Sequence, residues 1–209
     1  MLKAILFDFD GTLADSKAAF LSSYNVLAER HHYKKLTDAD FERFKGYSMK
    51  KRSNVLGIPF HKIPFLIGEF ARLHQRSMAS VPLMEGVREM LNALNASGYT
   101  LAILSSNDEK NIHAFLEHHH LDCFSEIMCS RQLFAKDRLI RKYLRQHRLI
   151  GSEAIYIGDE ERDILASRKS GVQSVWAAWG FDGIENVRRA HPDFIAYEPA
   201  HVLRIVRLL

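Results

Sequence analysis

The chain has 209 residues, of which 47% are hydrophobic and 26% are charged. This composition is typical of a globular protein with a sizeable apolar core, and the length fits one elaborated domain or two small domains. No apolar run approaches the roughly 18 residues that a membrane span needs, so the sequence predicts no membrane partner.

The net charge is +4, and basic residues gather between Arg131 and Arg148. Such a cluster can bind nucleic acid, but few aromatic residues interleave with it, so we expect a solvated helix face and no nucleic-acid partner. Cys123 and Cys129 lack the spacing of a redox or zinc motif, which predicts reduced structural thiols. No basic and apolar leader precedes the first predicted strand, so we expect a cytoplasmic protein.

The first predicted element is a buried strand over residues 4–7, followed by Asp8, Asp10 and the turn residue Gly11. A strand buried on both faces has no reason to end in two acids unless charge is needed there. Ligands bind at the carboxyl ends of strands in open α/β sheets. Two carboxylates there can hold a hard cation such as Mg²⁺, and one can form an aspartyl phosphate. The alternative interpretation is a turn that merely ends a strand.

The following segment of roughly seventy residues shows helical periodicity and no convincing strand. Helices are predicted over 16–30, from 37 to 44, over 48–55 and over 62–78, with Ser16 as the N-cap of the first. We therefore predict a helical cap domain over residues 15–84, inserted after the first strand.

From residue 87 onward, predicted helices and strands alternate. Helices are expected over 87–96, from Asn107 or Asp108 to 118, and over 136–147, 164–169 and 201–208. Strands are expected over 100–104, 127–129, 154–157, 174–177 and 193–196. This alternation predicts an α/β fold with a parallel sheet and right-handed crossovers. We assign residues 1–14 and 85–209 to this core.

Three predicted strands end in polar clusters, which are Asp8/Asp10, Ser105/Ser106 and Asp159/Asp163. In a parallel sheet these three ends lie along one edge, so residues far apart in sequence can converge. Asp8 can supply an attacking oxygen, Asp159 a second carboxylate for a metal, and Ser105 a hydroxyl for a phosphoryl oxygen. A lysine that offsets the negative charge would complete such a site.

These residues resemble the four motifs of the haloacid dehalogenase superfamily, in the same order. The motifs are Asp8-Phe9-Asp10-Gly11-Thr12, Ser105 after an apolar strand, Lys136 before a helix, and Gly158-Asp159 followed by Asp163. The resemblance covers nearly the whole chain. It implies a Rossmann-like parallel-sheet core with helices on both faces and a small α-helical cap, as in the phosphoglycolate phosphatase and phosphoglucomutase branch.

The resemblance also implies a role for each motif residue. Asp8 is expected to be the nucleophile, Asp10 the general acid and then the base, and Lys136 a group that neutralises charge. The expected phosphate-binding residues are Thr12, Ser105, Ser106 and Lys136. The expected Mg²⁺ ligands are Asp8, the Asp10 backbone carbonyl and Asp159, with Asp163 and Glu160 around them. Ser105 and Ser106 can exchange roles, and Asp163 can instead cap its helix.

Asp10 favours phosphoryl chemistry, because the dehalogenases of this superfamily lack the second acid of the first motif. The stretch Phe44-Lys45-Gly46-Tyr47-Ser48 resembles a recognition loop of phosphoglucomutases, yet Met49 replaces an arginine and Phe20 stands where a histidine is expected. Both departures weigh against a mutase.

We therefore predict a Mg²⁺-dependent phosphatase, a phosphoric monoester hydrolase that forms a phosphoaspartate. The expected partner is a small phosphorylated metabolite such as phosphoglycolate, and the expected state is a monomer or a homodimer. A phosphoglucomutase-like phosphoryl transferase and a non-catalytic binding or regulatory protein of this fold are the alternatives.

Overall fold

Six parallel strands form one sheet, in the order β3-β2-β1-β4-β5-β6. The computed structural model describes residues 1–75, 81–130 and 135–209. The strands are β1 (Ala4–Phe7), β2 (Thr100–Ser105), β3 (Phe124–Cys129), β4 (Ala154–Gly158), β5 (Gln173–Ala177) and β6 (Phe194–Ala196). Because β1 pairs with both β2 and β4, the three strand ends with polar clusters are neighbours.

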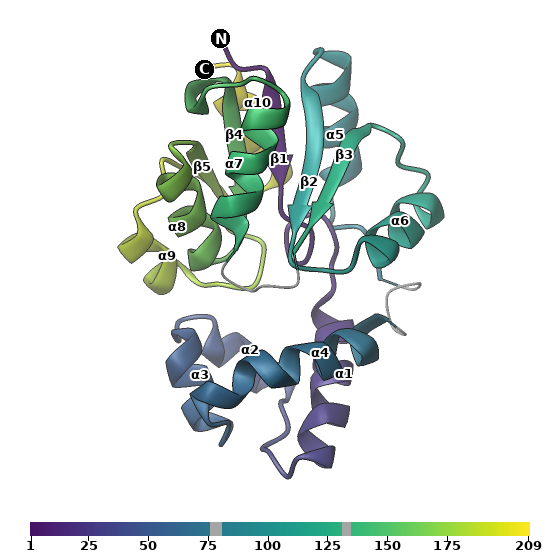
Figure 1. Ribbon diagram of the computed structural model, residues 1–209, viewed down its shortest axis with the longest axis vertical. Helices are drawn as coiled ribbons and strands as arrows, with labels where there is room; N and C mark the ends of the chain where they lie inside the picture. The colour runs from purple at the N-terminus through teal and green to yellow at the C-terminus, as the bar shows by residue number, and fades with distance from the viewer. Residues whose placement is uncertain (76–80, 131–134) are drawn as a thin grey trace.

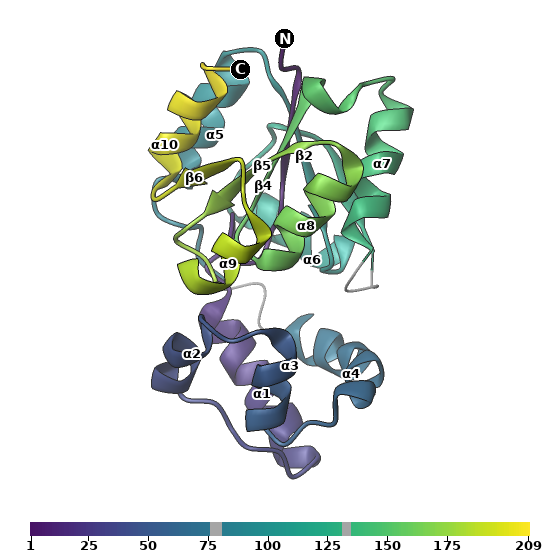
Figure 2. The same ribbon diagram turned by 90° about the vertical axis from the view of Figure 1, so that its left-hand side faces the viewer.

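Helices cover both faces of this sheet, as Figures 1 and 2 show. Ile5 and Phe7 of β1 belong to the core under α5 (Val87–Ala96), α6 (Glu109–His118) and α10 (Pro199–Val206). Ala4 and Leu6 point to the other face and pack with α7 (Lys136–Gln146) and α8 (Glu161–Ser170). A strand buried on both faces reads as an unbroken apolar run. The predicted α/β fold class is confirmed.

A layer of helices lies beyond the carboxyl ends of the strands (Figure 1). It consists of α1 (Lys17–Arg30), α2 (Asp38–Phe44), α3 (Met49–Val55), the 3₁₀ turn Phe60–Lys62 and α4 (Ile63–Gln75). We refer to residues 17–75 as the helical layer. It has an apolar cluster of its own, built on Leu21, Tyr24, Phe41 and Phe44. None of the helices in the described parts of the chain is long and apolar enough to span a membrane.

The chain enters and leaves the helical layer through two segments that run side by side. Ala14 forms an antiparallel bridge with Leu83. The Asp15 amide donates to the Pro82 carbonyl at 2.9 Å, and the Met84 amide donates to the Leu13 carbonyl at 2.9 Å. The first strand and the helical layer are therefore joined by a short paired connection next to Asp8 and Asp10.

Helix starts follow local capping chemistry, and most lie within two residues of the prediction. The Thr37 hydroxyl accepts from the Asp40 amide at 3.1 Å and starts α2. Pro199 occupies the first turn of α10, two residues before the predicted start, because its missing N–H has no intrahelical partner there. Ser16 precedes α1 without a side-chain cap, since its hydroxyl does not bond to that helix.

Other elements depart further from the prediction. Helix α8 begins at Glu161 rather than 164, because the Asp163 carboxylate accepts from the Glu160 amide at 3.0 Å and fixes the first turn. The seven-residue helix α9 (Ile184–Ala190), which packs near Trp176, was not predicted, because so short a helix carries little periodic signal. The predicted end of the fourth helix at Met78 lies outside the described residues.

Replacing Leu94 by alanine should lower the free energy of unfolding by about 2–5 kcal/mol, because the truncation leaves a cavity in the core under α5. Leu94 is 1% exposed, whereas Leu165 on α8 is 40% exposed. The matched variant Leu165→Ala should change the same quantity by less than about 1 kcal/mol. Urea unfolding followed by circular dichroism measures both. Equal losses would contradict this packing.

Candidate active site

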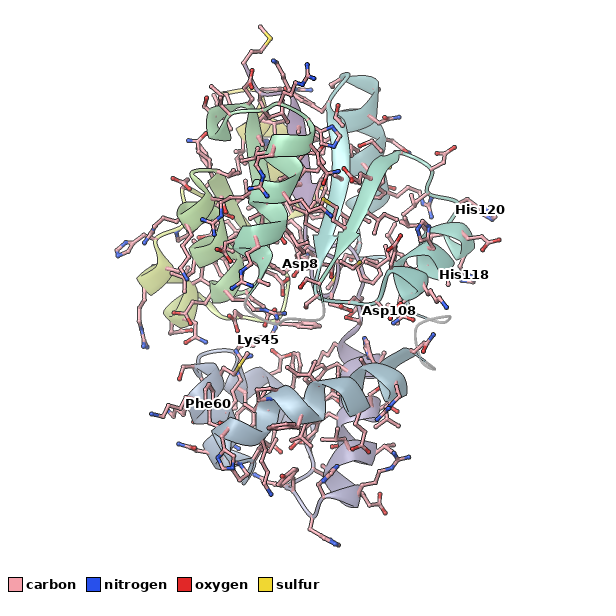
Figure 3. All side chains as sticks on the ribbon, in the orientation of Figure 1. Asp8, Lys45, Phe60, Asp108, His118 and His120 are labelled. Atoms are coloured by element: carbon pink, nitrogen blue, oxygen red, sulfur yellow. The ribbon has the colours of Figure 1, made fainter. Side chains whose placement is uncertain are left out.

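Asp8 and Lys136 form a buried ion pair at the carboxyl edge of the sheet. Asp8 directly follows β1, and its amide donates to the Ile157 carbonyl at 2.8 Å, which fixes it between β1 and β4. The Lys136 ammonium lies 2.5 Å from Asp8 Oδ2 and also pairs with Asp163. Asp8 is 2% exposed and Lys136 is 3% exposed, so water screens neither charge well. Figure 3 shows Asp8 at the end of the sheet that faces the helical layer.

The electrostatics of this pair reflect burial first and neighbouring charge second. Burial raises the pKa of Asp8 to about 7, although the Lys136 charge opposes the shift. Burial alone would lower the pKa of Lys136, but the carboxylates of Asp163 and Asp8 outweigh it and the pKa is raised. Lys136 is therefore a permanent cation, whereas Asp8 loses its proton only near neutral pH.

The Asp10 carboxylate is surrounded by Asn107 of the core, His74 of the helical layer and the hydroxyl of Ser16. The Asn107 amide nitrogen donates to Asp10 Oδ2 at 2.8 Å. Nε2 of His74, in the last turn of α4, lies 3.5 Å from Asp10 Oδ1. Burial would raise the pKa of Asp10, but the contacts with His74 and the other donors outweigh it, and the pKa is lowered. Asp10 is therefore a carboxylate at neutral pH in this arrangement.

The end of β2 supplies hydroxyl groups to the same edge. Ser105 is 1% exposed, and its hydroxyl accepts from the Asn107 amide at 3.1 Å. Since a hydroxyl also carries a proton, this group can donate to a ligand oxygen as well. Ser106 is the next residue and is partly exposed. The position of both serines fits the predicted phosphate site, and their roles stay predictions.

Asp159 is enclosed by the residues after β1 and β5. The Thr12 hydroxyl donates to its Oδ1 at 2.8 Å, and the Phe181 amide donates to its Oδ2 at 2.7 Å. Burial raises the pKa of Asp159 well above its ordinary value, and the charges of Glu160 and Asp8 add to the shift. In this structure Thr12 therefore orients the Asp159 carboxylate. Its predicted contact with phosphate stays a prediction.

Gly11 explains how the turn after Asp10 can approach Asp159 so closely. Its φ is +77°, and a Cβ atom at this position would lie 2.4 Å from Asp159 Oδ2. Any other residue would strain the backbone and displace that carboxylate.

The carboxylates of Asp8, Glu160 and Asp163 come within 4.8 Å of one another. Glu160 also pairs with Arg162, and Asp163 with Lys136. A cluster of carboxylate oxygens fits a hard divalent cation, which would relieve the repulsion between the carboxylates. The predicted ligand Asp159 is the neighbour of this cluster rather than a member of it, because its two oxygens are turned toward Thr12 and Phe181.

A cavity of about 160 Å³ lies between the helical layer and the core. The helical layer contributes Tyr47, Ser48, Met49 and Arg52, and the core contributes residues that include Lys136, Glu160, Arg162 and Asp182. Arg52 pairs with Asp182, so the two parts of the molecule are joined at its rim. The cavity is therefore lined by positively and negatively charged side chains of the core and by residues at the start of α3.

Three functional candidates lay beyond the sequence reasoning. The sequence predicts Asn107 only as a possible start of its helix, whereas its side chain donates to Asp10. No sequence pattern marks His74, because histidines are common on helices. Its closeness to Asp10 depends on how α4 packs against the core. Phe181 acts through its backbone amide, which a sequence pattern cannot reveal.

The comparisons with known proteins place this geometry in a family. The model of the haloacid dehalogenase-like hydrolases matches residues 5–177. The chain is 29% identical to a phosphoglycolate phosphatase of Synechococcus elongatus, over 100% of this chain and 99% of that protein. It is 24% identical to the pyrophosphatase PpaX of Bacillus velezensis, over 97% of this chain and 95% of that protein.

Solved structures agree with the family match. A haloacid dehalogenase-like hydrolase of Streptococcus pneumoniae superposes with a TM-score of 0.82 at 25% identity, covering 98% of both chains. A predicted phosphatase of Clostridium acetobutylicum gives 0.85 at 21% identity over the whole of both chains, which shows a shared fold. The predicted family, fold class and enzyme class are confirmed: this chain belongs to the haloacid dehalogenase-like hydrolases.

Proposed function

We propose that this phosphatase hydrolyses a small phosphate monoester, such as phosphoglycolate, with Asp8 as the nucleophile. The observation that carries the proposal is the buried pair of Asp8 and Lys136, with Asp10 two residues along the chain and Ser105 on the neighbouring strand. Relatives from Synechococcus elongatus and Vibrio cholerae that bear the name phosphoglycolate phosphatase support the choice of substrate.

The chemistry divides into two displacements at phosphorus. An Asp8 oxygen attacks the phosphorus, the bond to the ester oxygen breaks, and that oxygen leaves as an alcohol with a proton from Asp10. Water then attacks the phosphorus of phosphoaspartate and gives a proton to Asp10, which releases phosphate and restores the Asp8 carboxylate. The Lys136 cation would offset the negative charge of the phosphoryl oxygens, and the Ser105 hydroxyl would donate a hydrogen bond to one of them.

The lowered pKa of Asp10 keeps it ionised at neutral pH, which is the form that can accept a proton in the second step. The first step needs the protonated form. A bound phosphate dianion beside Asp10 would raise its pKa, because like charge disfavours the carboxylate. Substrate binding would thus prepare Asp10 to donate its proton.

Mg²⁺ is the proposed cofactor, and we expect Asp8, the Asp10 backbone carbonyl and Asp159 to hold it, with Asp163 and Glu160 around it. When bound, the cation supplies positive charge close to the phosphoryl group. The acidic cluster of Asp8, Glu160 and Asp163 supports a divalent ion at this edge. Hard oxygen donors without sulfur or nitrogen support Mg²⁺ over softer metals.

We further propose that residues 15–84 act as a cap and that residues 1–14 and 85–209 form the catalytic core. The paired connection at Ala14 and Leu83 supports a boundary there. The cavity beside Lys136, lined by Tyr47 and Met49 of the helical layer, would receive the part of the substrate that carries no phosphate. Closure of a cap over such a site excludes water and sets specificity.

A cytoplasmic location and a monomeric or homodimeric state complete the proposal. Cys123 and Cys129 are both free thiols, which supports a reducing compartment.

A panel of phosphorylated compounds with Mg²⁺ tests the function directly. We expect phosphate release from a small monoester such as phosphoglycolate, with weaker release from sugar phosphates, nucleotides and pyrophosphate, and none with EDTA. Transfer of phosphate between positions of a sugar, without release, would favour the mutase. A folded, Mg²⁺-bound protein that releases phosphate from none of them would contradict the phosphatase.

Replacing Asp8 by asparagine should lower kcat on the order of 10⁴-fold or more, because the nucleophile is lost. The matched variant Asp15→Asn makes the same chemical change at an exposed carboxylate on the neighbouring connection, and it should keep full activity. Steady-state phosphate release measures kcat, and thermal unfolding confirms that both variants are folded. Retained activity in Asp8→Asn would refute the nucleophile assignment.

Mg²⁺ should bind about tenfold more weakly at about pH 6 than at about pH 8, because a cation competes with the Asp8 proton. The sign follows from the raised pKa of about 7, below which Asp8 is mostly protonated. Titration calorimetry without substrate measures the affinity. Asp15→Asn should keep this pH dependence, and Asp8→Asn should weaken it, with Asp159 as the remaining carboxylate of raised pKa. Equal affinity at both pH values in the unmodified protein would show that Asp8 is not a ligand.

A further inference from the structure

His74 is a buried ring from the helical layer that reaches the catalytic edge of the core. It is 5% exposed and lies in the last turn of α4. Its Nε2 lies 3.5 Å from Asp10 Oδ1. Within the described residues, Nδ1 of His74 and Oδ1 of Asp10 are both buried without a hydrogen-bond partner. A buried polar ring with so little compensation is costly, so its place beside Asp10 calls for a function.

Aromatic stacking fixes the orientation of the His74 ring. The ring lies on Phe70 with centroids 5.3 Å apart and planes inclined by 17°. Phe70 in turn contacts Phe20 of α1, with centroids 5.2 Å apart. His74, Phe70 and Phe20 thus form an aromatic cluster in the helical layer, which ties the place of the His74 ring to that layer.

The same cluster reaches the site at a second point. Phe20 and Phe41 contact the ring of Phe181, with centroids 6.1 Å and 5.4 Å away. The Phe181 amide donates to Asp159 at 2.7 Å. The aromatic cluster of the helical layer is therefore in contact with one residue that touches Asp10 and with another that touches Asp159.

The two oxygens of Asp10 face donors from different parts of the molecule. Asn107 of the core binds Oδ2 at 2.8 Å, while Nε2 of His74 in the helical layer lies 3.5 Å from Oδ1, and the Ser16 hydroxyl at the start of that layer also acts on this carboxylate. A carboxyl group held at one oxygen can still rotate, whereas contacts at both oxygens fix its plane. Proton transfer to a leaving oxygen requires that plane to be set, because the reacting atoms must lie within hydrogen-bond reach.

We propose that His74 is a positioning residue that fixes the Asp10 carboxyl group for proton transfer to the leaving alcohol. Because His74 belongs to the helical layer, Asp10 is fully held only while that layer lies against the core. The proposal rests on the proposed phosphatase function and adds to it a link between closure and proton transfer.

The test compares two substrates whose leaving groups differ in their need for a proton. An alkyl phosphate must receive a proton as its alcohol leaves, whereas p-nitrophenyl phosphate releases a stable phenolate. The quantity to compare is kcat/KM, because it reports the steps up to departure of the leaving group and omits the later hydrolysis of phosphoaspartate.

In His74→Phe the ring can still stack on Phe70, but the nitrogen that faces Asp10 is lost. We expect kcat/KM to fall about 10²-fold for the alkyl phosphate, the lower end of general acid catalysis, and less than about threefold for p-nitrophenyl phosphate. His74→Gln, which can place an amide nitrogen near Nε2, should recover most of the loss. His119→Phe is the matched control, because His119 also contacts a phenylalanine ring, but its Nε2 donates to the Val81 carbonyl and not to Asp10.

Thermal unfolding checks that each variant is folded, and His74→Leu replaces His74→Phe if the latter is not. Equal losses on both substrates would assign His74 a purely structural role, and no loss on either would remove it from the mechanism. Either outcome overturns the positioning role while leaving the phosphatase intact. An unmodified protein that hydrolyses neither substrate would overturn the proposed function itself, together with this inference.

Discussion

The site depends on one buried cation, Lys136, placed between the carboxylates of Asp8 and Asp163. Removing one partner of a buried pair costs about 3–5 kcal/mol, because the remaining charge loses its compensation. The first turn of α7 is therefore tied to β1 and to α8 at the carboxyl edge of the sheet. Four acidic side chains, Asp8, Asp159, Glu160 and Asp163, gather here around Lys136 and Arg162, and this excess of acidic groups suits a divalent cation.

The helical layer joins the same site through contacts of three kinds. Arg52 of α3 pairs with Asp182, the Asn186 side chain donates to the Lys45 and Tyr47 carbonyls at 2.9 Å, and Phe181 enters the aromatic cluster. All three core residues lie in or just before α9, the short helix that the sequence analysis missed. The segment after β5 thus serves both parts: it supports Asp159 through its backbone and holds the helical layer through its side chains. This shared segment therefore joins the carboxyl edge of the sheet to the helical layer.

Much of the fold could be predicted from local patterns. The apolar run Ala4–Phe7 and the helix Val87–Ala96 appear with the predicted bounds, because burial on two faces and on one face leave distinct periodicities. The parallel sheet followed from the alternation of strands and helices, and it brought the ends of β1, β2 and β4 together. Lys136, Asp8 and Asp163 therefore meet as the order of motifs indicated, since each stands at a strand end or a helix start.

By itself, the sequence determined most of the elements, the parallel core, the family and the polar residues that stand at the carboxyl edge of the sheet. Those features are local or follow from chain order, so a pattern of neighbours can specify them. Only the tertiary structure decided that Thr12 turns to Asp159, that Asn107 holds Asp10, and that His74 reaches Asp10 from the helical layer. These contacts join side chains or turns that are distant in sequence. Their geometry depends on how the two parts of the molecule pack, which no local pattern encodes.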